Sequence, residues 1–243
     1  MKLLFIRHGD PEYVTDSLTE RGKKEAELLA KRMEHTHVDK CYVSPLGRAR
    51  LTAKPCLEKL GMEATEYDWL EEFSPKIHRP DSPDREHISW DWLPQDWTAR
   101  DCFYDRNDWW DDEILKEGHV RERAEYVWNG IDGLLKDHGY ERDGRIYRAV
   151  RPNNDTIALF CHFGVTALML SHMLGCSPMI LWHGMIAAPT SVTTVYTEER
   201  RKGIASFRIT SFGDVYHLYE AGIDPSFSGR FCECYDNEGE RRD

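Results

Sequence analysis

The sequence predicts an α/β fold, a three-layer sandwich with a mostly parallel sheet, helices on both of its faces and an inserted cap segment. Two observations support this prediction. The apolar runs KLLFIR at residues 2–7 and KCYV at residues 40–43 have the length of buried strands, and each precedes a segment with helical character. Because helical crossovers join parallel strands, the repeated order of strand and helix indicates a parallel sheet.

The first predicted helix covers residues 19–33 and is amphipathic. Thr19 is a suitable N-terminal cap for it. A second helix starts at Ser44 and Pro45 and ends at Gly61, since proline is favoured in the first turn of a helix and glycine just beyond the last. The apolar stripe of the first helix consists of Ala26, Leu29, Ala30 and Met33.

The order of strand and helix is interrupted between residues 74 and 118, where Trp, Asp and Pro are dense and no period is sustained. A helix at residues 119–138 restores it. The elements expected after that helix are strands at 144–150 and 156–161, an apolar helix at 163–174 that Gly175 ends, and a hairpin formed by 191–197 and 204–211.

These segments divide the chain into three parts. We expect residues 1–73 and 119–220 to form the α/β core and residues 74–118 to form the inserted cap. Residues 221–243 are a polar tail, which is either a flexible end or a strap across the surface.

The composition argues against several classes of partner. A formal net charge of −11 disfavours nucleic acid and anionic membranes as partners. No apolar run approaches the roughly 20 residues of a membrane helix, and the first residues supply no secretory signal. The seven cysteines follow no disulfide framework, which favours a reducing compartment. We therefore expect a cytoplasmic protein whose partner is a small molecule.

Chemically active side chains follow three of the predicted strands. Arg7, His8 and Gly9 come directly after the first strand, Arg48 follows the second, and His162 follows the strand at residues 156–161. Because ligands of open α/β sheets bind beyond the carboxyl ends of the strands, we expect these side chains to share one crevice.

At these residues the chain resembles the histidine phosphatase superfamily, the phosphoglycerate-mutase-like group. The order and the spacing of four motifs carry the resemblance. They are RHG at Arg7 to Gly9, LTERGKKEA at Leu18 to Ala26, SPLGRARLTA at Ser44 to Ala53, and HFG at His162 to Gly164.

The resemblance implies that His8 is the nucleophile and carries a phosphoryl group. A neutral imidazole nitrogen can attack phosphorus, which splits one transfer into two steps, and Gly9 leaves room beside the ring. Arg7 and Arg48 are expected to hold the phosphate oxygens, because guanidinium offers a planar fork of donors.

His162 is the second histidine of the superfamily by position, and we expect it to donate to the same oxygens. Backbone N–H groups at the start of the following helix, from Phe163 onward, are expected to add to the positive field.

The departing alkoxide needs a proton, which a carboxylic acid can supply if burial raises its pKa. The superfamily keeps this acid in a Leu-x-Glu setting after the third strand. The segment here is Trp69-Leu70-Glu71-Glu72-Phe73, so its register favours Glu72, with Glu71 as the alternative.

We expect neither a metal nor another cofactor. His35 and His37 have a spacing seen in metal sites, but they follow a helix end and no Cys or carboxylate cluster accompanies them. His8 and His162 are poor candidates for metal ligands, because the arginines beside them would repel a divalent cation.

The cap is acidic and aromatic, with eleven Asp or Glu against three Arg between Asp81 and Glu113, and with Trp90, Trp92, Trp97, Trp109 and Trp110. Its rings either pack the cap onto the sheet or form a lid over the substrate. An acidic cap disfavours a polyanion, and the basic middle segment of the glycolytic mutases is missing. The sequence therefore predicts a phosphatase, with a phosphoglycerate-type mutase and a non-catalytic phosphate-binding module as alternatives.

Overall fold

The predicted first strand, β1 (Lys2–Arg7), lies inside an eight-stranded sheet in the computed structural model, which describes residues 1–241. The strand order is β5-β4-β10-β1-β11-β12-β9-β8. The other strands are β4 (Lys40–Val43), β5 (Ala64–Glu66), β8 (Tyr140–Asp143), β9 (Ile146–Ala149), β10 (Thr156–Cys161), β11 (Val192–Arg201) and β12 (Ile204–Asp214).

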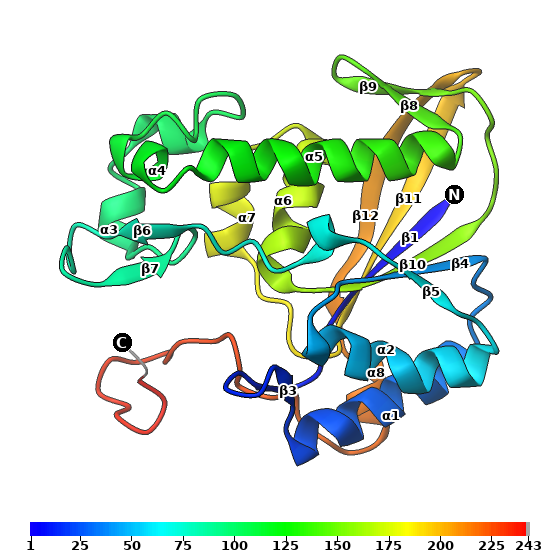
Figure 1. The fold of residues 1–243 in the computed structure, drawn as a ribbon, viewed down its shortest axis with the longest axis horizontal. Helices are drawn as coiled ribbons and strands as arrows, with labels where there is room; N and C mark the ends of the chain where they lie inside the picture. The colour runs from blue at the N-terminus through cyan, green and yellow to red at the C-terminus, as the bar shows by residue number, and fades with distance from the viewer. Residues whose placement is uncertain (242–243) are drawn as a thin grey trace.

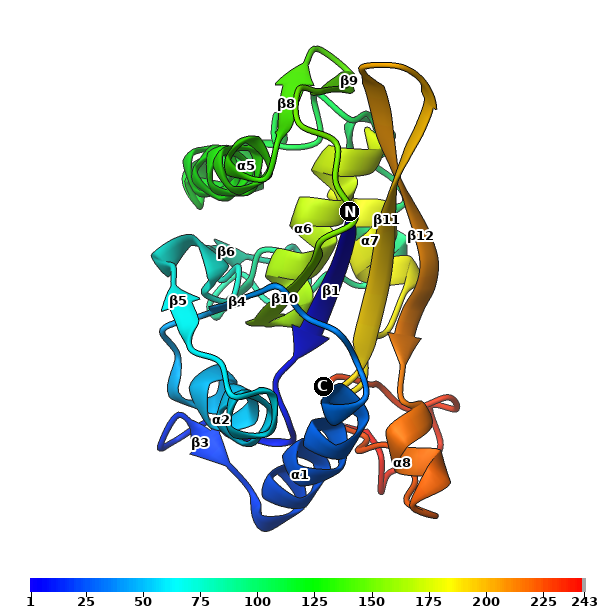
Figure 2. The same cartoon turned by 90° about the vertical axis from the view of Figure 1, so that its right-hand side faces the viewer.

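Half of the sheet is parallel. Strands β5, β4, β10 and β1 run in the same direction, with Arg7 paired to Cys161 and Phe160 paired to Val43. The carboxyl ends of these strands therefore meet at one edge. Strands β11, β12, β9 and β8 complete the sheet in antiparallel order, and α8 (Tyr216–Glu220) directly follows β12 (Figure 2).

Helices α1 (Glu20–Glu34) and α2 (Gly47–Leu60) cover one face of the sheet. The Thr19 hydroxyl accepts a hydrogen bond from Gly22 N, which confirms the predicted cap of α1. Gly61 ends α2 in the left-handed conformation at φ 63°. Alternate residues of β1, Leu4 and Ile6, contribute to the core beneath these helices.

Helices α5 (Val120–Asp137), α6 (Phe163–Leu174) and α7 (Pro178–Gly184) cover the opposite face (Figure 1). Leu3 and Phe5 of β1 belong to their core. Three layers are thus present, and the predicted fold class is confirmed. Helix α6 is buried on nearly all sides, because it lies between the sheet and helices α5 and α7.

The cap segment packs its aromatic rings inward. Phe103, Trp109 and Leu115 are fully buried and join the same core as α5 and α6. Its elements are β6 (Lys76–His78), β7 (Glu86–Ile88), α3 (Pro94–Trp97), η2 (Asp101–Tyr104) and α4 (Glu113–Glu117), and the short helix η1 (Asp68–Leu70) precedes it.

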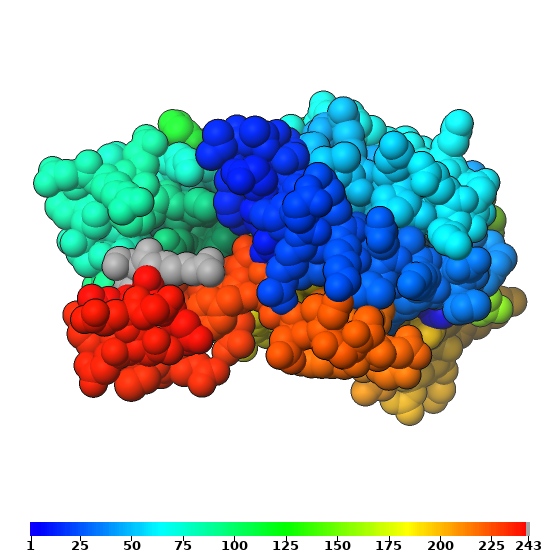
Figure 3. All heavy atoms as spheres, turned by 90° about the horizontal axis from the view of Figure 1, so that it is seen from below, coloured from blue at the N-terminus to red at the C-terminus, as the bar shows by residue number. Residues whose placement is uncertain are grey.

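The C-terminal tail crosses the surface. In Figure 3 the orange residues that follow α8 lie beside the blue N-terminal region. The hairpin of β2 (Pro11–Glu12) and β3 (Ser17–Leu18) belongs to that N-terminal region. Within residues 1–241, no helix is both long and apolar enough to cross a membrane.

Several details differ from the sequence-based expectations. Helix α2 begins at Gly47 instead of Ser44, because Leu46 has an extended backbone at φ −71° and ψ 137°. Strand β8 and helix α7 were not predicted. Both are short, at four and seven residues, and neither is long enough to display a clear period.

Candidate active site

His8 lies at the carboxyl end of β1, where its ring is almost fully buried at 2% exposure. Its Nδ1 atom is 2.7 Å from Gly9 O, and a carbonyl can only accept, so Nδ1 carries the proton. Burial, followed by the charges of Arg7 and Arg48, holds the pKa of His8 well below its ordinary value. The ring is therefore neutral near pH 7, with the Nε2 lone pair available for attack on phosphorus.

Arg7 precedes the histidine and is also buried. Its Nη1 atom donates to Ala187 O at 2.5 Å and to Ser228 O at 3.3 Å. The second acceptor belongs to the C-terminal tail, so residues from both ends of the chain meet at this guanidinium.

Arg48 is held by a carboxylate that the sequence did not suggest. Its Nη1 atom donates to Asp16 Oδ1 at 2.5 Å, and Asp16 Oδ2 accepts from Gly47 N at 2.6 Å. Asp16 has a φ of 47°, in the left-handed region that Asp tolerates better than most residues. Its carboxylate thereby fixes both the guanidinium and the N-terminus of α2.

His162 lies at the carboxyl end of β10 and is fully buried. Its Nε2 atom is 2.8 Å from the Ser44 hydroxyl, at the end of the neighbouring strand β4. Burial, the interaction with the His8 ring and the charges of Arg48 and Arg7 hold the pKa of His162 well below its ordinary value. Both histidines are therefore neutral near pH 7, and Arg7 and Arg48 carry the positive charge.

The structure brings Arg7, His8, Arg48 and His162 together, as the sequence predicted. The two imidazole rings have centroids 5.1 Å apart and are tilted by 56°. Three buried nitrogens of the set, Arg7 Nε, Arg48 Nε and His162 Nδ1, have no hydrogen-bond partner in the described part of the chain. Such nitrogens are costly to bury unpaired, and an anion placed among them could supply acceptors.

Glu72 lies at the start of α6, beside this set. Its carboxylate accepts from Phe73 N at 2.8 Å, Val165 N at 2.9 Å and Gly164 N at 3.3 Å. Burial raises the pKa of Glu72, although these three N–H groups act in the opposite direction. A carboxyl with a raised pKa next to a phosphate site can deliver and take up a proton.

The rival acid, Glu71, has a different environment. Its carboxylate accepts from Arg123 Nη2 on α5 at 3.3 Å, and this pair is partly exposed. The cap approaches Glu72 instead, because the Trp90 indole donates to Phe73 O at 2.6 Å and lies edge-on to the Phe163 ring. Glu72 therefore lies at the start of α6, beside the residues that the sequence singled out, whereas Glu71 points to α5.

Gly9 has a packing role in the structure. Its N–H donates to Thr52 Oγ1 at 2.8 Å, and a Cβ atom at this position would lie 2.7 Å from Gly22 O of α1. The same Thr52 hydroxyl donates to Arg48 O at 2.8 Å, so it links the loop of His8 to the helix of Arg48. The space beside His8 is thus occupied by helix backbone, which explains the need for glycine there.

The amides at the start of α6 are divided between two tasks. The N–H groups of Gly164 and Val165 donate to Glu72. Of the N–H groups that were expected to face a phosphate, these two are therefore already bound, and that of Phe163 is not bound by Glu72. The Gly164 backbone must come close to the acid, because a Cβ atom there would lie 2.7 Å from Glu72 Oε1 and 2.6 Å from Trp90 Nε1.

Part of the C-terminal tail lies against this region as a strap, defined here as residues 224–230. The Ser226 hydroxyl donates to Asp10 Oδ1, and Arg21 donates to Asp224 O. Gly229 lies close to Arg7, since a Cβ atom there would be 2.8 Å from Arg7 Nη1. Of the two alternatives for the tail, the strap is the one that these residues adopt.

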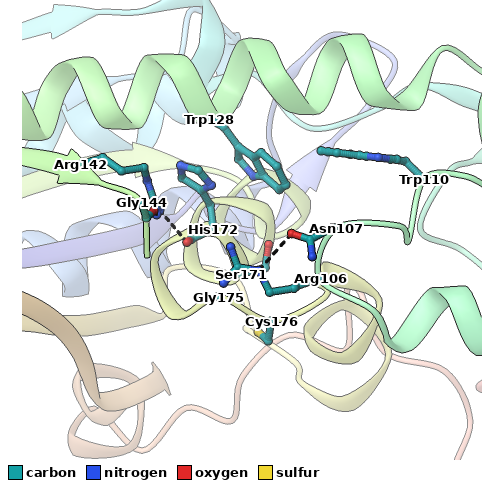
Figure 4. Close-up of a pocket in the computed structure, with 10 residues that line it drawn as sticks. All are labelled: Arg106, Asn107, Trp110, Trp128, Arg142, Gly144, Ser171, His172, Gly175 and Cys176. Atoms are coloured by element: carbon teal, nitrogen blue, oxygen red, sulfur yellow. Dashed lines mark hydrogen bonds between the residues drawn. The ribbon is translucent and has the colours of Figure 1, made fainter. Parts of the chain in front are cut away.

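A cavity of about 170 Å³ lies toward the other end of α6, and none of the predicted site residues lines it. Figure 4 shows Trp128 between His172 and Trp110, above Ser171 and Cys176. Trp128 stacks on His172 at 4.6 Å. Arg142 beside them donates to Asp132, to the Tyr147 hydroxyl and to His172 O, so this arginine is committed to internal hydrogen bonds.

His35 and His37 follow the end of α1, and His37 is 3.1 Å from Asp39 in an exposed pair. Among residues 1–241, no group of three or more His, Cys, Asp or Glu side chains could hold a metal ion.

Comparisons with known proteins agree with the fold. Residues 3–210 match the family model of the histidine phosphatase superfamily (branch 1). Phosphoserine phosphatase 1 of Hydrogenobacter thermophilus is 25% identical over 228 residues, which cover 89% of this chain and 96% of that protein.

Two solved structures are similar in fold. A mutant phosphoserine phosphatase from Entamoeba histolytica in complex with phosphoserine has a TM-score of 0.57 and 20% identity, covering 89% of this chain and 98% of that one. A mycobacterial glucosyl-3-phosphoglycerate phosphatase in complex with VO3 has a TM-score of 0.53 and 18% identity, covering 87% and 98%.

Proposed function

Because the chain belongs to the histidine phosphatase superfamily, we propose that it hydrolyses small phosphomonoesters through a phosphohistidine formed on His8. The predicted family and the predicted phosphatase type of enzyme are confirmed. The observation that carries the proposal for this site is the pair of buried, neutral imidazoles 5.1 Å apart, flanked by Arg7 and Arg48.

In the first step, His8 Nε2 attacks the phosphorus atom. The new N–P bond forms as the P–O bond to the alcohol breaks, and the departing oxygen takes a proton from Glu72. The proton on His8 Nδ1, bound to Gly9 O, stabilises the ring as it becomes positively charged.

In the second step, water attacks the phosphohistidine. Glu72, now a carboxylate, accepts a proton from that water, the N–P bond breaks, and inorganic phosphate leaves with neutral His8 restored. The raised pKa of Glu72 suits this exchange, and the three N–H groups around it stabilise the carboxylate between the two steps.

Arg7, Arg48 and His162 are the groups that we assign to the phosphoryl oxygens, together with the N–H of Phe163. Charge spreads over these oxygens in the transition state, and donors that are already fixed stabilise it without reorganisation. The ion pair with Asp16 and the hydrogen bond to Ser44 fix Arg48 and His162 before substrate binds.

We assign residues 74–118 to a cap over the leaving-group side of the site, on a core of residues 1–73 and 119–220. Trp90 supports this assignment, because its indole donates to Phe73 O, next to Glu72, and lies against Gly164 at the start of α6. The acidic character of the cap disfavours a bisphosphate intermediate, so hydrolysis is favoured over mutase transfer.

The substrate class that we propose is a small phosphorylated metabolite, bound in the cytoplasm without nucleic acid, membrane or cofactor. Seven free cysteines support a reducing compartment. The net charge of −11 disfavours polyanionic partners.

A phosphate-release screen tests the proposed function. It should include phosphoserine, glucosyl-3-phosphoglycerate and α-ribazole phosphate, because proteins similar to this chain are named as phosphatases of these three compounds. We expect release from at least one ester, an acid-labile phosphoenzyme in the native chain, and loss of both in His8→Ala. Isomerisation of 3-phosphoglycerate with a bisphosphate primer would instead support a mutase, and binding without turnover would support a phosphate-binding module.

A further inference from the structure

We infer that Thr190 is a positioning residue for His8, and that the buried side chain of His217 keeps Thr190 in place. The inference rests on the proposed function, since it concerns how the nucleophile is oriented. Neither residue belongs to a motif that the sequence singled out, and both lie far from His8 along the chain.

The backbone of Thr190 is held in an unusual conformation. Its φ is 57°, in the left-handed region, which is a genuine outlier for a β-branched residue. Such a conformation persists only where the surroundings impose it. Thr190 is also fully buried, so the surroundings that impose it are the packed residues around the site.

This conformation directs the Thr190 N–H at the nucleophile. The N–H donates to His8 O at 3.1 Å, which fixes the peptide unit that follows the imidazole. The neighbouring Ser191 O accepts from Arg7 N at 3.1 Å, and Ala187 O accepts from the Arg7 guanidinium. Backbone groups of residues 187–191 therefore fix both the nucleophile and the arginine assigned to the phosphate through hydrogen bonds.

The Thr190 side chain is fixed by two partners. Its hydroxyl donates to Pro189 O at 2.7 Å, so it must accept at its other contact, from His217 Nε2 at 3.0 Å. His217 is 3% exposed, and its Nδ1 atom lies 3.5 Å from Arg32 Nη1. Arg32 is in turn paired with Asp214 at 2.9 Å. A continuous series of contacts therefore runs from Arg32 on α1, through His217 on α8 and Thr190, to the backbone of His8.

Three substitutions at position 190 distinguish the contribution of the Thr190 hydroxyl from that of the left-handed backbone conformation. Thr190→Val keeps the branched shape and removes the hydroxyl, so we expect kcat to fall by about tenfold or more with KM changed by less than about threefold. Thr190→Ser keeps the hydroxyl and should stay within about threefold of the native kcat. Thr190→Gly adopts the left-handed conformation without strain, so its loss should be smaller than that of Thr190→Val.

A double-mutant cycle tests the link to His217. His217→Leu should lower kcat by about tenfold in the native background and by less than about threefold in the Thr190→Gly background, because glycine no longer needs the side-chain support. His138→Leu is the matched control. His138 is a buried histidine with a 2.8 Å contact to the Tyr42 hydroxyl, and it lies at the opposite edge of the sheet, near the amino end of β4.

The inference is overturned if Thr190→Val keeps the native kcat, if His217→Leu lowers kcat equally in both backgrounds, or if His138→Leu lowers kcat as much as His217→Leu.

The ¹⁵N NMR signals of the His8 ring give a readout that needs no turnover. They should report a proton on Nδ1 in the native chain and a changed tautomer population in Thr190→Val. A native chain without phosphatase activity would sink the proposed function, while unchanged His8 signals in Thr190→Val would sink the positioning role alone.

Discussion

The Ser44 hydroxyl lies 2.8 Å from His162 Nε2, and both side chains are fully buried. The same oxygen accepts from Leu46 N at 3.3 Å, so the hydroxyl proton is free to point at the ring. A neutral His162 then carries its own proton on Nδ1, one of the buried nitrogens without a partner. Ser44 thereby sets the tautomer of His162, and in this tautomer Nδ1 is the donor that the proposed mechanism assigns to a phosphate oxygen.

We expect Ser44→Ala to lower kcat by about 10- to 100-fold, because the imidazole loses both its tautomer and its orientation. KM should change much less. Steady-state kinetics with p-nitrophenyl phosphate measure both constants, and Ser171→Ala serves as the control, since Ser171 is a fully buried serine that donates to Leu168 O within α6. Equal losses of kcat in the two variants would count against the assignment.

The sequence was informative where a residue lies in a motif or where an element displays its own period. Helix α1 was predicted to within one residue because its apolar stripe and its cap are both local, and β1 and β10 are uninterrupted apolar runs. His8 and His162 could be predicted for a related reason. They follow strands whose carboxyl ends must meet if the sheet is parallel.

The residues that hold these groups could not be predicted in the same way. Asp16 accepts a hydrogen bond from Arg48, which lies 32 positions away in the sequence, and Ser226 donates to Asp10, which lies 216 positions away. Such pairs depend on how loops pack after the sheet has formed, and neither loop carries a period. The left-handed backbone of Asp16 and Thr190 also gave no signal, because glycine is the residue that marks this conformation in a sequence.

Glu72→Gln should slow esters with poor leaving groups by about 10²- to 10⁴-fold, the range typical of general acid catalysis. An ester of p-nitrophenol needs little protonation of its leaving group and should be affected less. The measurement is a comparison of kcat for alkyl and p-nitrophenyl phosphates. Glu71→Gln is the matched control, because that carboxylate is bound to Arg123 and should leave the ratio unchanged. The opposite result would assign the acid to Glu71.

Stability should fall in mildly acidic solution because of the buried histidines. Burial lowers the pKa of His217 to about 4 and the pKa values of His8 and His162 well below 6.5. Between pH 6.5 and 4 the unfolded chain therefore binds protons that the folded chain does not, so the free energy of unfolding falls as the pH falls. Each such histidine contributes up to about 1.4 kcal/mol per pH unit.

Urea unfolding at pH 7.5 and pH 5 measures this effect. The raised pKa values of Glu25 and Glu72 act with the opposite sign, so the informative quantity is a difference between two proteins. We expect the stability of His217→Leu to change less between the two pH values than that of the native chain. An equal change in both proteins would show that His217 does not titrate with a depressed pKa.

Removal of the strap should widen the range of substrates. Ser228 O accepts a hydrogen bond from the Arg7 guanidinium, and the Ser226 hydroxyl donates to Asp10, so residues 224–230 restrict the space beside Arg7. A chain that ends after Ile223 should show a higher kcat/KM for bulky phosphomonoesters relative to p-nitrophenyl phosphate, by about tenfold. A chain that ends after Arg230 keeps every one of these contacts and should retain the native ratio. If both shortened chains shift the ratio alike, the residues beyond the strap are responsible, and if neither does, the strap leaves the substrate path open.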